Sequence, residues 1–402
     1  MHILLLIVYG ALASYGIWKI PFLRKSGIRP GWLWLLFVLH VLTGWAHNLI
    51  AYRYFPEHGD IWNYFSLSFL YRHRLLSEFH LFVSDNSTWT YITHNGIVYV
   101  QMLLNLFSGD DMTVNTLLFA FPVFLGNVAL FRVFSRRFGG DGMAAGAVFW
   151  LPSVVFWTAC IYREGMLFML LGFLFFHLDR LPARRSAYYA VALFLLIAYF
   201  RLAVAVVLGV ALLVWWWMGR PLKRRTRQGV GLAGIVLLAL VFSVPLVRAP
   251  ILRAVTTEQA SFQILEGHSR LPLPVLDGTL GSFCRALPRA VLNGFFEPLP
   301  GSGGQTAYLA FSIELTLVWV VVLLAAIRVR RLSFSPFSAA CVLFALGGML
   351  LIGFVVPFAG TIVRYRSIYL PFLLAPALHS LRLHPAMQRL NHWLNNKLQF
   401  LI

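Results

Sequence analysis

A small set of acidic and basic residues stands at the ends of long apolar stretches, in a chain that otherwise carries few charges. Ionisable groups at the rim or depth of a membrane are functional candidates by default, because they are costly to place there. Guanidinium groups bind phosphate through paired hydrogen bonds, and a carboxylate can accept the proton of an attacking hydroxyl. Such a set would suit the transfer of a sugar from an isoprenoid phosphate to an acceptor. The candidate residues are Glu57, His58, Asp60, Arg163, Glu164, Arg201, Glu314, Arg364 and Arg366.

Each candidate has an expected role in that chemistry. Asp60 is the expected general base, with Glu57 beside it. Arg201, Arg364 and Arg366 are expected to bind the donor phosphate, and either they or a divalent cation could stabilise the leaving group. The secondary candidates, which would position arginines or the acceptor, are Arg163, Glu164, Glu314 and His58. The spacing of the histidines does not predict a metal site.

Structural roles are the alternatives to this chemistry. Asp60 could only cap the helix that follows it. Arg163 and Glu164 could pair with each other, or with a neighbouring loop, and so stabilise a hairpin. The two arginines before the last apolar stretch could extend to lipid headgroups. Glu314 lies within an apolar stretch, where an unpaired carboxylate is costly, so we expect a polar partner for it.

Long apolar stretches must position these residues. The chain has 402 residues, of which 59% are hydrophobic and 12% charged, whereas a soluble domain carries about a quarter charged residues. A backbone in a bilayer must satisfy its own hydrogen bonds, so we expect an all-α polytopic membrane protein with about eleven spans. The expected spans are residues 2–18, 31–50, 112–133, 142–160, 166–179, 186–200, 202–218, 229–247, 306–327, 336–358 and 367–381.

The basic residues set the expected orientation. Most of the 33 lysines and arginines, including every lysine, fall on one side of the membrane if the N-terminus lies outside. Because short cytoplasmic loops are rich in Lys and Arg, we expect an outer N-terminus and a cytoplasmic C-terminus. The formal charge of +19 is spread between apolar stretches rather than gathered on one face. That pattern disfavours nucleic-acid binding and favours contact with anionic membrane lipids.

Two long segments are expected outside, within a single transmembrane domain of residues 1–402. The first covers residues 51–111, in which Tyr64–Leu76 and Ile97–Phe107 alternate apolar and polar residues at helical spacing. Amphipathic helices of this kind lie flat on a membrane surface. The second covers residues 248–306 and is punctuated by prolines, so we expect a compact loop of turns and short helices.

Four passages carry a resemblance to a known family. They are Gly59-Asp60 with Tyr64, Leu151-Pro152-Ser153-Val154-Val155-Phe156-Trp157 continuing to Arg163-Glu164, Asn293-Gly294-Phe295-Phe296-Glu297-Pro298 followed by Glu314, and Arg364-Tyr365-Arg366 through Pro371. Together they resemble the GT-C superfamily of membrane glycosyltransferases and the related bacterial polysaccharide-assembly proteins. The passages extend over most of the chain, and each motif is short.

That resemblance implies a scaffold of many membrane helices with flat helices in the first outer loop. It implies an acidic residue in this loop that serves as base or metal ligand, a place that Asp60 occupies. It also implies an isoprenoid-linked sugar donor and outer arginines near its phosphate. The implied location is the bacterial inner membrane, with a glycan, lipid or protein acceptor on the periplasmic face. The chain departs from the family pattern, because an extra helix precedes Asp60 and no Asp-x-Asp or Glu-x-Asp pair is present there.

Two other functions would use similar parts. A polymerase of lipid-linked oligosaccharide repeat units would hold two pyrophosphates with outer arginines and would yield a ladder of products. A transporter of lipid-linked glycans is less favoured by the sequence. Transporters often contain internal repeats and helices broken at the midplane, whereas this chain shows no internal repeat and its charged groups gather at one rim.

Overall fold

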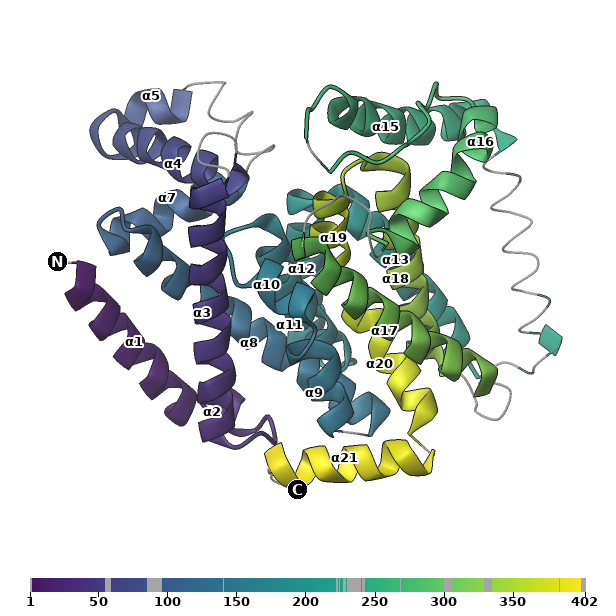
Figure 1. The fold of residues 1–402 in the computed structure, drawn as a ribbon, viewed down its shortest axis with the longest axis horizontal. Coiled ribbons are helices and arrows are strands. Elements are labelled where there is room, and N and C mark those ends of the chain that lie inside the picture. The colour runs from purple at the N-terminus through teal and green to yellow at the C-terminus, as the bar shows by residue number, and fades with distance from the viewer. Residues whose placement is uncertain are drawn as a thin grey trace. The chain divides into compact units, whose positions relative to one another are not determined.

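The computed structural model shows a chain made almost entirely of helices (Figure 1). The residues that it describes are 2–54, 59–84, 96–139, 141–221, 223, 225–226, 229, 240, 243–267, 269–299, 306–328, 335–382 and 384–398. Within these residues no β-strand forms, and the only pairing of that kind is an isolated bridge between Arg270 and Phe358. The expectation of an all-α protein is confirmed for this part of the chain.

The chain divides into two compact units, the first made of residues 1–206 with 381–402 and the second of residues 207–380. The helices of the first unit are α1 (His2–Lys19), α2 (Pro21–Arg24), α3 (Pro30–Tyr54), α4 (Asp60–Ser77), α5 (Phe79–Ser84), α7 (Gly96–Ser108), α8 (Met112–Phe138), α9 (Asp141–Phe149), α10 (Pro152–Thr158), α11 (Arg163–Leu178), α12 (Arg184–Phe200) and α21 (Pro385–Leu398). Helix α8 is the centre of this unit, and α1, α3, α7, α9 and α11 pack against it.

Both ends of α8 are fixed by local hydrogen bonds. Asp111 caps its start, because the carboxylate accepts hydrogen bonds from the backbone N–H groups of Thr113 and Val114 at 2.9 and 2.8 Å. Gly139 ends it in the left-handed conformation, with φ of 64°. The central helix therefore begins and ends where its sequence places a cap and a glycine, and most of its side chains between them are buried.

The second unit is built around α18. Its helices are α13 (Leu202–Met218, which begins in the first unit), α15 (Pro245–Gln263), α16 (Leu280–Val291), the π-helical turn η1 (Leu292–Phe296), α17 (Thr306–Arg328), α18 (Pro336–Val355), α19 (Ala359–Arg366) and α20 (Leu370–Leu381). Helices α15, α16 and α19 and the turn η1 all pack on α18. The segment 248–306, expected outside, contains most of α15 together with α16 and η1, and its location outside the membrane remains a prediction.

Five of the described helices, α1, α3, α8, α17 and α18, are long and apolar enough to cross a membrane. A sixth span results if α10 and α11, which are bent by 107° at the break between them, count as one. The expected total of about eleven spans is therefore not established, since α13 and α20 are apolar but shorter. Most of the expected span 229–247 lies outside the described residues.

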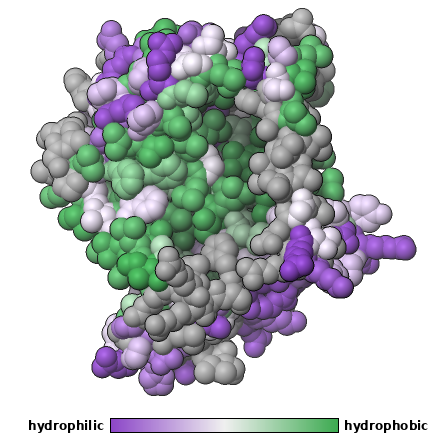
Figure 2. All heavy atoms as spheres, turned by 90° about the vertical axis from the view of Figure 1, so that its right-hand side faces the viewer, coloured by the Kyte–Doolittle hydropathy of each residue, from purple (hydrophilic) through white to green (hydrophobic). Residues whose placement is uncertain are grey.

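Apolar side chains point outward from several of these helices. Ile3, Leu213 and Ile327 are 75%, 67% and 76% exposed. On the face that Figure 2 shows, apolar residues form a broad band between hydrophilic residues at the upper and lower margins. A soluble protein rarely leaves so much contiguous apolar surface in water, so the structure is compatible with a multi-pass membrane protein.

Both helices expected in the first outer segment are present, as α4 and α7. They pack together through Tyr71 of α4 and Val98 and Met102 of α7, which are all buried. In Figure 1, α4 runs across the direction of α3 rather than along it. Their position flat on the membrane surface remains a prediction.

Candidate functional site

The first candidate site is built around the break between α10 and α11. Helix α10 begins at Pro152, a favoured first position because proline has no N–H to leave unpaired there. It ends at Thr158, and the backbone from Ala159 to Tyr162 is buried between the two helices. Non-helical backbone at membrane depth is tolerated only where protein surrounds it or it lines a cavity.

Two glycines let neighbouring helices approach this break. A Cβ atom on Gly44 of α3 would lie 2.7 Å from the carbonyl oxygen of Ala159. A Cβ atom on Gly165 of α11 would lie 2.6 Å from the carbonyl oxygen of Thr158. Real Cβ atoms essentially never come so close to another heavy atom. Glycine at these two positions thus leaves room for the backbone of the break, because glycine has no side chain.

Glu164 and Arg201 form a part-buried ion pair beside this break. The carboxylate Oε1 of Glu164 lies 3.3 Å from Nη1 of Arg201, and the two side chains are 3% and 18% exposed. Glu164 lies in the first turn of α11, where the helix dipole favours negative charge. Arg201 follows α12 in extended conformation. The two residues are 37 positions apart, so the fold unites two candidates that the sequence placed separately.

A group of aromatic rings surrounds His47 of α3 at the same break. The ring centroids of Phe156, Trp157 and Tyr162 lie 4.8, 5.1 and 5.3 Å from that of His47. Tyr64 of α4 lies 6.5 Å from Tyr162, ring to ring. Two of the passages that carried the family resemblance are therefore in contact. His47 was missed by the sequence reasoning, although a histidine inside an apolar span is a signal of the kind that finds functional residues.

Asp60 lies at the start of α4, on the edge of this group. It is the first residue of the helix, and Gly59 occupies the capping position without a side-chain hydrogen bond. The next residue, Ile61, is buried in the same apolar cluster as Cys160 and Tyr162 of the break. The start of α4 is thus held close to the α10–α11 break. Glu57 and His58 lie outside the described residues.

An open pocket of about 350 Å³ lies beside this group, between α3, α4 and the start of α8. Its lining includes Asn48 and Trp62. The Asn48 Oδ1 atom and the Trp62 Nε1 atom are buried, and neither has a hydrogen-bond partner within the described part of the chain. Buried polar atoms are nearly always paired, so the Asn48 Oδ1 acceptor and the Trp62 Nε1 donor are candidates for hydrogen bonds with the hydroxyl groups of a ligand. The volume lies within the range of small-molecule sites.

The second candidate site, in the other unit, is a buried charge cluster around Arg366. Arg366 is 2% exposed and is the largest fully buried side chain described. Its Nη1 atom donates hydrogen bonds to the carbonyl oxygens of Glu297 and Gly294, at 2.6 and 3.4 Å. Burial lowers the pKa of Arg366 to about 10, whereas the nearby carboxylates of Glu314 and Glu297 raise it. The guanidinium therefore stays charged near neutral pH. The attraction between Glu314 and Arg366 accords with the expectation that Glu314 has a polar partner.

The π-helical turn η1 shapes this cluster. Arg289 of α16 lies 3.5 Å from the Glu297 carboxylate and donates to the carbonyl oxygen of Pro272 at 2.9 Å. Trp319 of α17 donates from Nε1 to the carbonyl oxygen of Phe295, at 2.6 Å. π-helical turns occur frequently at functional sites. Glu297 belongs to one of the passages that carry the family resemblance, but the sequence predicted no role for Glu297 or Arg289, because only the fold brings them into this cluster.

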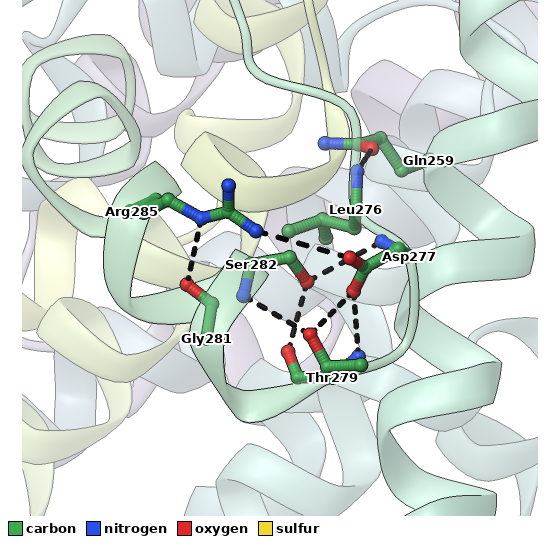
Figure 3. Close-up of polar contacts among 7 residues, drawn as sticks. All are labelled: Gln259, Leu276, Asp277, Thr279, Gly281, Ser282 and Arg285. Carbon is green, nitrogen blue, oxygen red and sulfur yellow. Dashed lines mark hydrogen bonds and ion pairs between the residues drawn. The ribbon is translucent and has the colours of Figure 1, made fainter.

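Hydrogen bonds at the start of α16 position the helix that carries Arg289 (Figure 3). Asp277 accepts hydrogen bonds from the backbone N–H and the hydroxyl of Thr279, at 2.8 and 2.6 Å. Hydrogen bonds with the side chains of Thr279 and Ser282 lower the pKa of Asp277 to about 2. Gln259 of α15 accepts a hydrogen bond from the backbone N–H of Leu276, at 2.8 Å. This network ties α16 to α15.

The remaining candidates lie in α11 and α19. Arg163 is the first residue of α11. Arg364 is half-buried in α19, and its Nη2 atom donates to the hydroxyl oxygen of Tyr365 at 3.3 Å. Arg201 belongs to the first unit, whereas Arg364 and Arg366 belong to the second. Among the residues that the structure describes, no three His, Cys, Asp or Glu side chains gather as a metal site would require.

Comparison of the chain with models of known protein families, with curated proteins and with solved structures finds no match. The described part of the chain is helical, with five or six helices able to cross a membrane, and each of its two units holds a guanidinium group beside at least one carboxylate.

Proposed function

We propose that the protein is a polytopic glycosyltransferase of the bacterial inner membrane. It transfers a sugar from an isoprenoid-phosphate donor to a glycan, lipid or protein acceptor on the periplasmic face. In this proposal the chain crosses the membrane about eleven times, with a periplasmic N-terminus and a cytoplasmic C-terminus. The observation that carries the proposal is the α10–α11 break with its part-buried Glu164–Arg201 pair, next to the helix that Asp60 begins.

Sugar transfer from such a donor requires a cation for the phosphate, a surface for the sugar or acceptor, and an apolar face for the isoprenoid tail. Arg201 keeps some exposure and can bind a phosphate oxygen, while Glu164 positions its guanidinium. The aromatic rings around His47 and the pocket beside Asn48 provide a surface for a sugar or acceptor. Exposed apolar helix faces suit the isoprenoid tail.

Asp60 is the proposed general base, with Glu57 as the nearby secondary carboxylate. The acceptor hydroxyl oxygen attacks the anomeric carbon, the bond from this carbon to the phosphate oxygen breaks, and Asp60 accepts the hydroxyl proton. The isoprenoid phosphate leaves with the electron pair, and its negative charge is stabilised by Arg201. A divalent cation could add to that stabilisation.

The arginines of the second unit are proposed to differ in role. Arg364 is half-buried and remains a proposed ligand of the donor phosphate. Arg366 donates hydrogen bonds to two backbone carbonyl oxygens. These bonds favour a role in which Arg366 positions the turn that precedes Pro298. Substitution of each arginine separately tests this distinction.

The test is complementation of a deletion in the native host, read by mass spectrometry of isoprenoid-linked sugars and surface glycans. We expect the deletion strain to accumulate one lipid-linked donor and to lose one sugar. Asp60→Asn should be expressed and should fail to restore the sugar, whereas Glu78→Gln, a matched change in the same outer segment, should restore it. Full restoration by Asp60→Asn would show that Asp60 is not the base.

Two alternatives give different products in the same experiment. A polymerase of lipid-linked repeat units predicts loss of a ladder of chain lengths rather than of one sugar. A transporter of lipid-linked glycans is favoured by one observation, the broken α10–α11 segment, because transporters place such breaks at their binding sites. If the protein is a transporter, its deletion would leave a complete lipid-linked glycan on the cytoplasmic side.

A further inference from the structure

A second pocket, of about 220 Å³, opens in the first unit where α8 and α11 end. We call it the basic pocket. Its lining residues are Lys25, Ser26, Arg132, Val133, Ser135, Arg136, Phe176, Asp179 and Arg180. Its residues take no part in the proposed sugar transfer.

Contacts with aromatic rings and backbone hold the arginines of the basic pocket in place. Arg132 donates from Nη1 to the carbonyl oxygen of Phe22, at 3.1 Å. Its guanidinium carbon lies 5.0 and 5.1 Å from the ring centroids of Phe22 and Phe176. The guanidinium carbon of Arg180 lies 3.7 Å from the same Phe176 ring. Such cation–π contacts reduce the freedom of both side chains, so the charges are preorganised.

The charges of the basic pocket do not balance. Asp179 is the one acidic residue among the lining residues, all of which the structure describes, against four basic ones. Its carboxylate is 6% exposed and already pairs with Arg136 and with the neighbouring Arg137. The pocket therefore gathers positive charge in a partly enclosed space, where like charges repel unless an anion joins them.

We propose that the basic pocket binds a phosphate group, carried by an anionic phospholipid headgroup or present as free phosphate. Arginine donors suit phosphate oxygens, which they bind through paired hydrogen bonds. Basic pockets between membrane helices on the cytoplasmic side are places where anionic lipid headgroups bind. Ser26 and Ser135 line the same pocket, and a serine hydroxyl can add a neutral donor.

The test measures lipid binding to the purified full-length protein in neutral detergent by native mass spectrometry. The probes are phosphatidylglycerol, phosphatidylcholine and inorganic phosphate. The pocket variant is Arg132→Gln with Arg180→Gln, and the matched control is Arg184→Gln with Arg185→Gln, two exposed arginines outside the pocket. We expect phosphatidylglycerol to bind the wild type in preference to phosphatidylcholine. The pocket variant should weaken that binding by roughly 30-fold, at about fivefold for each lost charge.

The competition with inorganic phosphate distinguishes the two sources of the phosphate group. Displacement of phosphatidylglycerol by millimolar phosphate shows that the phosphate alone is sufficient, whereas persistence of the lipid shows that its glycerol and acyl groups are also required. Arg180→Gln alone is a second variant, chosen because a change at an exposed position is less disruptive to folding. It should weaken binding about fivefold. Equal losses in the pocket variant and the control, or equal binding of the two lipids, would overturn the proposal.

Discussion

The Glu164–Arg201 pair gives the most direct prediction. Its side chains are 3% and 18% exposed, so the carboxylate depends on its partner more than the guanidinium does. Arg201→Gln removes a cation from beside a buried carboxylate, and removal of one partner from a buried pair costs about 3–5 kcal/mol. Glu164→Gln leaves an arginine that water can still reach, so we expect a smaller loss of about 1–3 kcal/mol.

The assay is thermal unfolding of the purified protein in detergent, for both single variants and the double variant. Because the two residues are in contact, the double variant should be less destabilised than the sum of the single effects by about 1–3 kcal/mol. Arg184→Gln, an exposed change at the start of α12, is the matched control and should change stability by less than about 0.5 kcal/mol. Strictly additive losses, or a larger loss for Glu164→Gln than for Arg201→Gln, would refute the reasoning.

Three further predictions concern other parts of the structure. Gly165→Ala should destabilise the protein by about 1–3 kcal/mol, because the added Cβ atom would meet a carbonyl oxygen; Gly146→Ala, which has open space, should not. Asp277 has its pKa lowered to about 2 in the folded state, so its contribution to stability is present above its unfolded pKa and is lost as the pH falls toward 2. Arg366→Gln should cost about 3–5 kcal/mol, because it removes a buried cation that attracts two buried carboxylates.

Thermal unfolding checks all three. Equal stability of the two glycine variants would show that α11 can move away from the break. For Asp277, the stability of the wild type and of Asp277→Asn should converge as the pH falls from about 4 to 2, and a constant difference would contradict the assignment. Arg366→Lys should recover part of the loss, and recovery by Arg366→Met instead would show that packing rather than charge matters.

The membrane-capable helices could be predicted from the sequence because their signal is local. A span needs about 20 apolar residues in a row, and the expected spans 2–18, 31–50 and 336–358 correspond to α1, α3 and α18. The expected span 142–160 instead forms two helices, α9 and α10. Pro152 follows the end of α9 and cannot donate a backbone hydrogen bond, so hydropathy alone overstated the continuity of this segment.

The candidate residues could be found from the sequence, but their partners could not. The sequence left open whether Glu164 pairs with Arg163 or with a neighbouring loop, and the structure places Arg201, which directly follows α12, beside it. Pairing at such a separation depends on how α11 and α12 pack, and a charge pattern does not contain that information. His47 was missed because its neighbours come from α10 and the residue before α11, which only the break brings to α3.

Arg366 and Arg201 differ in burial, and this difference favours a positioning role for the first and a binding role for the second. A guanidinium has five N–H donors in a fixed plane. Arg366 is almost fully buried and directs its Nη1 group at two carbonyl oxygens, so a phosphate would have to displace protein to reach it. Arg201 is held by a carboxylate and keeps a side chain that is 18% exposed. If both arginines support sugar transfer, substitution of Arg201 should weaken donor binding, whereas substitution of Arg366 should act through the fold of the turn before Pro298.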